Sequence, residues 1–293
     1  MPVLQRVSVS VKNILVATDF SSVSDQAAAY AKALALNFRS SVEIAHVFDP
    51  SVVTSYVEAI FGLPAKEREL ACKEKLDLLE LDFASAGIEV STALPEGHRP
   101  YAALLRLAEY HDTDLIVAGT HSKWGLERLV LGSTAEEIIR HAACPVLTVG
   151  PHAKRPAEGP LVFHTIVYAT DFTDEAAKAA VYALSFAQDS GAHIYFCYVA
   201  GSDATPEQRK TQDASFKTAL KNLIPESTYE WCTPETVVEH GDASEAILEL
   251  AERVGADLIV LGARNASFWL THIGHGLTPD LLAESTCPVM TVC

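Results

Sequence analysis

The chain has 293 residues, with 22 Lys and Arg against 38 Asp and Glu, giving a formal net charge of −16. The hydrophobic fraction of 49% excludes wholesale disorder, and the length predicts two domains of ordinary size. So acidic a chain repels phosphate backbones, and no stretch approaches the roughly 20 apolar residues of a membrane span, so neither nucleic-acid nor membrane binding is expected. A small anion could still bind through backbone N–H groups.

The cysteines and the start of the chain indicate a compartment. None of the 6 cysteines forms a CxxC pair, so neither a disulfide framework nor a zinc site is indicated. The first residues lack the long apolar region and the cleavage site of a signal peptide. We therefore expect a reducing, cytoplasmic location.

Short apolar runs alternate with longer helical patterns in the first part of the chain. Continuous apolar strands separated by helices predict a parallel sheet covered on both faces. Ligands of such sheets bind beyond the carboxyl ends of the strands. The elements expected in chain order are a strand at 14–18, a helix at 21–38, a strand at 42–48, a helix at about 64–86, a strand at 88–94, a helix at 101–110, a strand at 115–118, a helix at 133–141 and a strand at 146–149.

A long internal repeat organises the chain. Three segments of the first part return in the same order in the second, which predicts a duplicated domain. We expect one domain over 1–150, a linker rich in Pro and polar residues over 151–160, and a second domain over 161–293. The recurring pairs are NILVATDFS and TIVYATDFT, DLIVAGT and DLIVLGA, and CPVLTV and CPVMTV.

Two places after strands carry candidate binding residues. Asp19 follows the first strand, where a carboxylate can bind a ribose hydroxyl or cap the next helix. After the fourth strand, a loop that starts at Gly119 leads into a helix near Ser133, and glycines beside a helix N-terminus make a phosphate cradle. The alternative is that Ser133 and Glu136 form a capping box, which needs no ligand.

On these residues the chain resembles a tandem universal stress protein. The resemblance rests on ATDFS and ATDFT after the first strands, AHV and CYV at the second, DLIVAG and DLIVLG at the fourth, and CPVLTV and CPVMTV at the last. Nucleotide-binding members of this family have the pattern G-x2-G-x9-G-[S/T]. The first copy keeps the spacing as Gly119-x2-Ser122-x9-Gly132-Ser133, with Ser in place of the second Gly.

The resemblance implies both a fold and a site. The fold is two repeated doubly wound α/β domains, each with a five-stranded parallel sheet and helices on both faces, Rossmann-like and of the adenine nucleotide alpha hydrolase type. The implied ligand is ATP or another adenine nucleotide, with Mg²⁺ as part of the nucleotide complex. The implied contacts are Gly119, Ser122, Gly132, Ser133 and Thr134 around the phosphates, Ala17 and Asp19 near the ribose and adenine, and the backbone of Val47 at the adenine edge.

The departure at Ser122 leaves two outcomes open. If the position needs a positive φ, Ser is strained where Gly is not, and binding weakens. Alternatively, the hydroxyl donates a compensating hydrogen bond.

The second copy departs much further from the family pattern. Asn265, His275 and Gly276 stand at the second Gly, the third Gly and the Ser. Thr278 and Pro279 read as a helix cap and a first-turn Pro, which moves the helix start. We therefore expect that the second copy has lost phosphate binding and is a structural or differently liganded half.

Asp171 and Val199 remain in the second copy, so a nucleoside subsite there stays open. The resulting hypothesis is a stress-response protein whose first domain binds an adenine nucleotide as a sensor or switch, with no catalytic residues singled out. The alternatives are a nucleotide-free scaffold that acts through protein contacts and a slow ATPase. The resemblance also suggests that the last strands of the two domains pair within the chain, and that the whole chain forms a homodimer.

Overall fold

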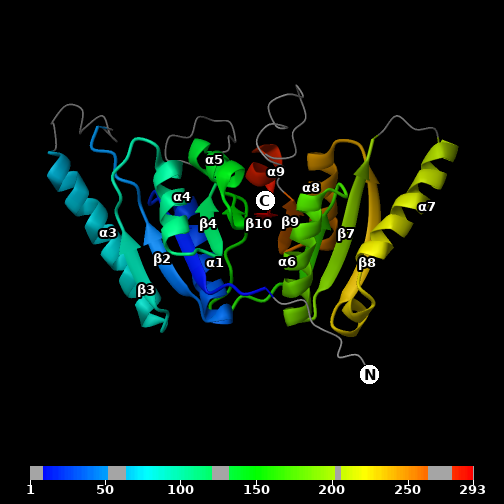
Figure 1. The fold of residues 1–293 in the computed structure, drawn as a ribbon, viewed down its shortest axis with the longest axis horizontal. Coiled ribbons are helices and arrows are strands. Elements are labelled where there is room, and N and C mark those ends of the chain that lie inside the picture. The colour runs from blue at the N-terminus through cyan, green and yellow to red at the C-terminus, as the bar shows by residue number, and fades with distance from the viewer. Residues whose placement is uncertain (1–8, 52–63, 121–131, 202–205, 263–278, 293) are drawn as a thin grey trace.

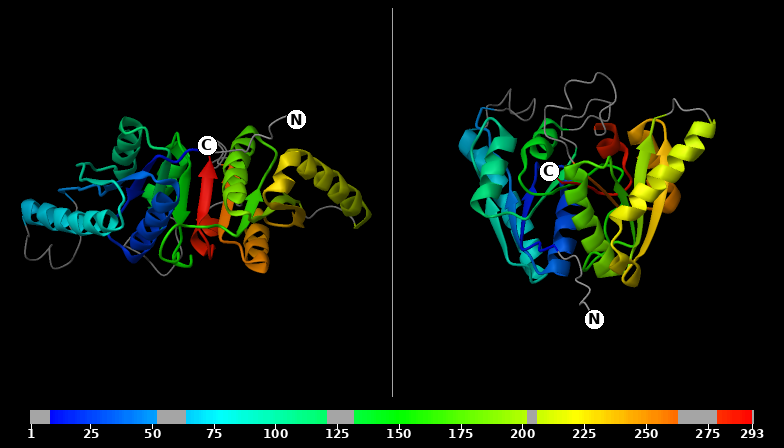
Figure 2. Two further views of the ribbon diagram at one scale, coloured as in Figure 1. Left: turned by 90° about the horizontal axis from the view of Figure 1, so that it is seen from below. Right: turned by 45° about the vertical axis from the view of Figure 1, so that its right-hand side comes forward.

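The two halves of the chain build one continuous sheet. The structure, a computed structural model, describes residues 9–51, 64–120, 132–201, 206–262 and 279–292. Its strands lie in the order β3-β2-β1-β4-β5-β10-β9-β6-β7-β8. Each half supplies five parallel strands, and helices lie on both sides of the sheet in each half (Figure 1 and Figure 2). The expected fold class is confirmed.

The elements alternate as the sequence predicts. In the first half they are β1 (Asn13–Ala17), α1 (Ser22–Phe38), β2 (Ser41–Ala45), α3 (Ala65–Ser85), β3 (Val90–Ala93), α4 (Pro100–Tyr110), β4 (Leu115–Gly119), α5 (Ser133–His141) and β5 (Val146–Val149). In the second half they are β6 (Thr165–Ala169), α6 (Asp174–Ser190), β7 (His193–Ala200), α7 (Pro206–Leu223), the 3-10 helix η1 (Glu226–Glu230), β8 (Thr233–His240), α8 (Ala243–Val254), β9 (Leu258–Gly262), α9 (Pro279–Glu284) and β10 (Val289–Val292).

The apolar strands are buried because helices cover both faces. α1, α3, α6 and α7 pack into one apolar cluster, and α4, α5, α8 and α9 into a second. Ile116 and Val117, neighbours on β4, are both fully buried and belong to different clusters. Continuous apolar runs rather than alternating patterns follow from this arrangement. No helix in the described ranges is both long and apolar enough to cross a membrane.

The first helix of each half begins and ends by the same means. The hydroxyls of Ser21 and Thr173 cap α1 and α6 by accepting a hydrogen bond from the N–H three residues on. Both helices end at a residue in the left-handed conformation, Arg39 with φ 57° and Gly191 with φ 67°. The N-cap of α1 is therefore Ser21.

The last strands of the two halves pair antiparallel, as expected from the family resemblance. Met290 of β10 lies opposite Leu147 of β5, and the Thr148 hydroxyl donates to the Val289 carbonyl at 3.0 Å. Paired strands leave β5 and β10 without an open edge at the centre of the sheet. The sheet edges of the whole molecule are β3 and β8.

The segment that joins the halves lies against α1. The Tyr30 hydroxyl donates to the Lys154 carbonyl at 2.6 Å, and the Leu161 N–H donates to the Ala33 carbonyl at 3.0 Å. Burial raises the pKa of Tyr30, which keeps its hydroxyl protonated as the donor. The connection is therefore fixed to the first half by its own backbone groups.

Two expected strands are shorter than the apolar runs that predicted them. β2 ends at Ala45 rather than at 48, and β3 covers Val90–Ala93 rather than 88–94. The Thr18 N–H donates to the Ala45 carbonyl, and beyond this point β1 has turned away toward α1. A single bridge from Phe48 to Glu96 continues the pairing of these two segments.

Candidate functional site

The residues expected to bind a nucleotide line the carboxyl edge of the first half. Ala17, the last residue of β1, lies opposite Ala118 on β4 and Ala45 on β2. Gly119 follows Ala118 directly on β4, and Val47 comes two residues after Ala45, the last residue of β2. The sheet therefore brings Ala17, Gly119 and Val47 to one edge, as predicted.

The turn after β1 is held by side chains. The Thr18 hydroxyl accepts from the Phe20 N–H at 3.0 Å, and the Asp19 carboxylate accepts from the Ser21 N–H at 2.9 Å. Phe20 has a positive φ of 59°, which the two bonds hold in place. Asp19 thus closes the turn before the helix cap rather than being the cap, and its second carboxylate oxygen has no hydrogen bond in the described part of the chain.

The backbone of Val47 faces the same edge. The Phe48 N–H donates to the Pro95 carbonyl at 2.9 Å, and the Phe48 carbonyl accepts from Gly97 at 3.0 Å. The peptide groups of Phe48 therefore point toward the segment after β3. Because peptide groups of an extended chain alternate in direction, the N–H and C=O of Val47 point to the opposite side, past the end of β1. An adjacent N–H and C=O suit the donor and acceptor on the edge of a purine.

The N-terminus of α5 forms the end of the loop after β4. The Gly132 N–H donates to the Thr120 carbonyl at 2.7 Å, which ties the helix start to the end of the strand. Gly132 is the N-cap and offers no side chain to the helix, so the N–H groups of Ser133 and Thr134 have no acceptor in the described ranges. Unpaired N–H groups at a helix start attract an anion.

The capping box that the sequence left open does not form. Ser133 is the first helical residue rather than the N-cap, because the helix begins one position earlier than such a box needs. The Glu136 carboxylate instead pairs with the Arg140 guanidinium at 2.7 Å. The predicted bounds of this helix, 133–141, are confirmed.

Gly119 has a packing reason that involves no ligand. A Cβ at this position would lie 3.1 Å from the Ser24 nitrogen and the Val23 carbonyl carbon, both in the first turn of α1. Gly262, its equivalent in the second half, is tighter still, with a Cβ position 2.5 Å from the Ala176 nitrogen. Both glycines let a helix approach the sheet closely, so Gly119 alone says little about nucleotide binding.

Aromatic and basic groups border the edge in the first half. The Phe20 ring lies 4.4 Å from the His46 ring, and the Lys75 ammonium lies 5.1 Å from the Phe20 centroid. The Thr18 carbonyl is 2.8 Å from His46 Nδ1, so this nitrogen carries the proton as donor. A positive side chain close to the turn favours an anionic ligand.

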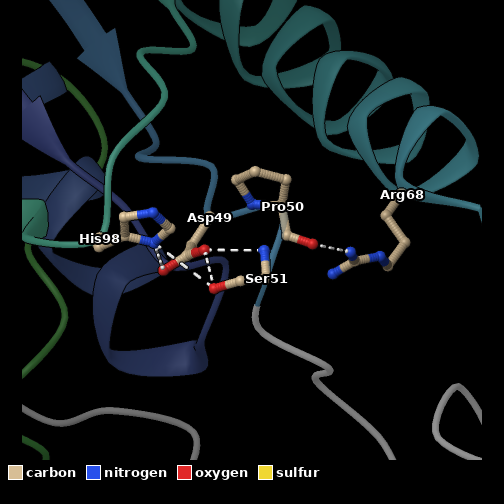
Figure 3. A network of polar contacts seen from close by, with 5 residues as sticks. All are labelled: Asp49, Pro50, Ser51, Arg68 and His98. Carbon is tan, nitrogen blue, oxygen red and sulfur yellow. Dashed lines mark hydrogen bonds and ion pairs between the residues drawn. The ribbon is translucent and has the colours of Figure 1, made fainter.

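A network that the sequence did not reveal holds the segment after β2 (Figure 3). Asp49 accepts hydrogen bonds from the N–H and hydroxyl of Ser51 and pairs with His98 Nδ1 at 2.9 Å. The Ser51 hydroxyl and then His98 hold the pKa of Asp49 at about 2, so its carboxylate stays charged. Arg68 of α3 donates to the Pro50 carbonyl at 2.6 Å.

This network holds residues 49–51 in place at the carboxyl edge of the sheet. Its partners lie far apart in sequence, and an Asp with a His nearly fifty residues later forms no motif. The only available signal was their position, since both follow strands at the same sheet edge.

The second half keeps the turn and changes what surrounds it. Phe172 has a φ of 61°, and its N–H donates to the Thr170 hydroxyl at 3.0 Å, as in the first half. Tyr198 stands where the first half has His46, and its ring lies 5.0 Å from Phe172 and 4.3 Å from Phe216 of α7. Uncharged rings thus replace the imidazole and the ammonium.

The helix after β9 begins late, as predicted. α9 starts at Pro279 and has 6 residues, against 9 in α5. Ser122 lies outside the described residues, as do Asn265, His275, Gly276 and Thr278. Among the described residues, no group of three or more His, Cys, Asp or Glu side chains is placed to hold a metal ion.

Comparisons with known proteins agree with the resemblance. The model of the Universal stress protein family matches residues 10–150 and 163–292. Universal stress protein MJ0531 of Methanocaldococcus jannaschii is 38% identical over 146 residues, which are 47% of this chain and 81% of the relative. A universal stress protein of Thermus aquaticus is 35% identical over 138 residues, 47% of this chain and 98% of its own.

A solved structure shares the doubled architecture. The crystal structure of a universal stress protein from Archaeoglobus fulgidus DSM 4304 covers 98% of this chain and 97% of its own, with a TM-score of 0.72 and 19% identity. At that identity the likeness concerns the fold. The two matched segments of the family model span nearly the whole sequence. The chain belongs to the universal stress protein family, with two such domains in tandem.

Proposed function

We propose that this stress-response protein binds one adenine nucleotide per chain, ATP or a relative of it, in its first half. The observation that carries the proposal is the start of α5, where Gly132 caps the helix without a side chain and leaves two N–H groups to an anion. Val47 supplies backbone groups for the base, and Asp19 supplies a carboxylate oxygen for the ribose. Mg²⁺ would come with the phosphates as part of the nucleotide complex.

Binding, rather than turnover, is the role we assign to this site. The candidate residues position a ligand through backbone groups, and none of the described side chains near α5 forms a nucleophile and base pair. A nucleotide bound without rapid turnover suits a sensor or switch in the cytoplasm. The scaffold and the slow ATPase remain the alternatives that the experiment must separate.

Gly132→Asp tests the proposal without a large cost to the fold. Gly132 has φ −62° and ψ 133°, which any residue adopts, and Asp is a favoured N-cap. We expect the helix to gain about 0.3 kcal/mol from the new cap, because Gly is itself a tolerated N-cap residue. Nucleotide affinity should fall by a factor of about 100 or more, because a carboxylate then occupies the anion position.

The matched control is Gly201→Asp, at the carboxyl end of β7 in the second half. A Cβ there meets no described atom within 4 Å, so the substitution adds the same charge without a clash against the described residues. Nucleotide released from the denatured protein is identified by mass spectrometry, and the emptied protein is titrated with ATP, ADP, AMP and cyclic AMP by calorimetry. Equal affinity of the folded Gly132→Asp and Gly201→Asp variants would reject the site, and no binding by the wild type would favour the scaffold.

Phosphate release separates binding from hydrolysis. We expect no sustained release of phosphate when the wild type is incubated with Mg²⁺ and ATP. Steady release that disappears in Gly132→Asp and persists in Gly201→Asp would establish the slow ATPase instead.

A further inference from the structure

The outer helix of the first half, α3, leaves apolar side chains in solvent. Leu70, Leu78 and Leu81 are 58%, 68% and 67% exposed. At about 100° per residue, Leu81 lies about 20° and Leu78 about 80° around the helix from Leu70, so the three share one face. Isolated exposed leucines are ordinary, but three on one face of one helix form a patch.

The side of α3 opposite the leucines packs against the rest of the protein. Leu76 and Phe83 are buried in the first apolar cluster. Arg68 donates to the Pro50 carbonyl, and Lys75 lies over the Phe20 ring. These contacts fix α3 on the flank of the molecule (Figure 1). The three leucines are exposed and lie on the opposite side of the helix from Leu76 and Phe83.

The second half provides an internal comparison. α7 occupies the opposite flank (Figure 1). Among its described side chains, no large apolar group is exposed. Phe216 and Leu223 of α7 are half-buried and Leu220 is fully buried. The fold therefore does not require leucines on the outside of this helix.

Acidic side chains share the leucine face. Glu67, Glu74 and Asp77 are exposed and lie within the same arc of about 100°, between and beside the leucines. Lys66 borders the arc, and Lys73 is paired with Glu69 at 2.5 Å. The face, which we call the α3 face, therefore combines three leucines with an excess of negative charge.

We propose that the α3 face binds a basic amphipathic helix of a partner protein, whose apolar side chains cover the leucines and whose Lys or Arg side chains meet Glu67, Glu74 and Asp77. A second copy fits less well. An antiparallel pair that sets Leu70 against Leu81 also sets Glu74 against Asp77 of the other copy, on chains that each carry −16. An anionic lipid surface would be repelled in the same way.

The test uses full-length protein and a synthetic probe. The probe is a fluorescent Leu/Lys peptide of about 18 residues, long enough to hold a helix, with its leucines on one face. A scrambled peptide of equal composition removes the face and keeps the charge. Fluorescence anisotropy is measured for the wild type, for Leu78→Gln with Leu81→Gln, and for Glu74→Gln with Asp77→Asn.

Two control variants match these changes elsewhere. Glu245→Gln with Glu249→Gln removes two exposed charges from α8, and Val181→Gln removes an exposed apolar group from α6. We expect the leucine pair to weaken binding at least tenfold, the acidic pair at least threefold, and the controls less than twofold. The scrambled peptide should bind at least tenfold more weakly than the probe.

Any one of four results would overturn the proposal. If the α3 variants and the control variants weakened peptide binding equally, the binding would be general charge attraction. The same would follow if the scrambled peptide bound as tightly as the probe. A wild-type dimer in sedimentation that Leu78→Gln with Leu81→Gln dissociates would give the face to a second copy. If the wild type bound vesicles of phosphatidylcholine and phosphatidylglycerol and the same variant did not, the α3 face would be a lipid-binding surface.

Discussion

The carboxyl edges of the two halves share one turn and differ in the helix start beside it. Thr18 and Thr170 each accept a hydrogen bond from the N–H two residues later, and the Phe that follows the Asp has a positive φ in both. α5 begins directly after Gly132, and its first N–H groups have no acceptor in the described ranges. α9 begins at Pro279, which has no N–H to offer.

This difference separates residues that serve the fold from residues that serve a ligand. The Thr-Asp-Phe turn and the glycine that ends the fourth strand occur in both halves, and each has a packing or hydrogen-bonding reason of its own. The sequence of the loop after the fourth strand and the position of the helix start differ between the halves. The loop and the helix start are therefore a better guide to a nucleotide site than the turn and the strand-end glycine.

The largest expected effect concerns the two strand-end glycines. In Gly262→Ala the new Cβ would lie 2.5 to 2.8 Å from three backbone atoms of α6, whereas in Gly119→Ala the nearest atoms are 3.1 Å away. Backbone cannot move aside cheaply, so we expect Gly262→Ala to cost about 3 kcal/mol and Gly119→Ala about 1 kcal/mol. Urea unfolding followed by circular dichroism measures both.

Gly201→Ala is the control for this pair, because its Cβ would meet none of the described atoms within 4 Å and its φ is not positive. We expect a change within about 0.5 kcal/mol there. Equal losses for Gly119→Ala and Gly262→Ala would show that the two helices do not differ in how closely they approach the sheet.

The shared turn gives a smaller effect in each half. Thr18→Val and Thr170→Val keep the shape but remove the acceptor for the N–H of Phe20 or Phe172. Thr18→Val also removes the donor to the Ser24 hydroxyl, at 3.1 Å. We expect each to cost about 1–2 kcal/mol, since a part-buried N–H is left without its partner. ATP affinity should fall only in Thr18→Val, and an equal fall in Thr170→Val would place a second nucleotide site in the second half.

The sequence was sufficient for the order of elements because strand and helix patterns are local. Buried parallel strands are continuous apolar runs, and caps such as Ser21 are recognisable from a few residues. Strand ends were less accurate: the apolar run to Phe48 exceeds β2, because pairing depends on where the neighbouring strand turns away. That information lies in another part of the chain.

For the candidate site, too, the sequence predicted some features and missed others. Its location followed from the rule that ligands bind at the carboxyl ends of parallel strands, which placed Asp19 and Gly132 correctly at the edge. The pairing of Asp49 with His98 and the contact of Gly119 with α1 join residues distant in sequence. Neither contact leaves a spacing signal in the sequence, so each becomes visible only in the folded structure.

The smallest effect concerns a carboxylate present in the first half alone. Glu43 of β2 occupies the register position that Tyr195 has in the second half. Its Oε1 lies 3.4 Å from His111, and its Oε2 is buried without a hydrogen-bond partner in the described part of the chain. Burial raises the pKa of Glu43, and the nearby His111 lowers it by a lesser amount.

A raised folded-state pKa means that ionisation of Glu43 opposes folding. The unfolded chain releases this proton at the ordinary value, about 4.3, so stability falls as the pH rises from there through the folded pKa. Glu43→Gln should therefore stabilise the protein by about 0.5–1 kcal/mol near pH 7 and have little effect near pH 3, measured by urea unfolding. Glu89→Gln removes the same charge from an exposed neighbour and serves as the control. A gain in Glu43→Gln that is equally large at both pH values would mean that packing, not ionisation, distinguishes this position from Tyr195.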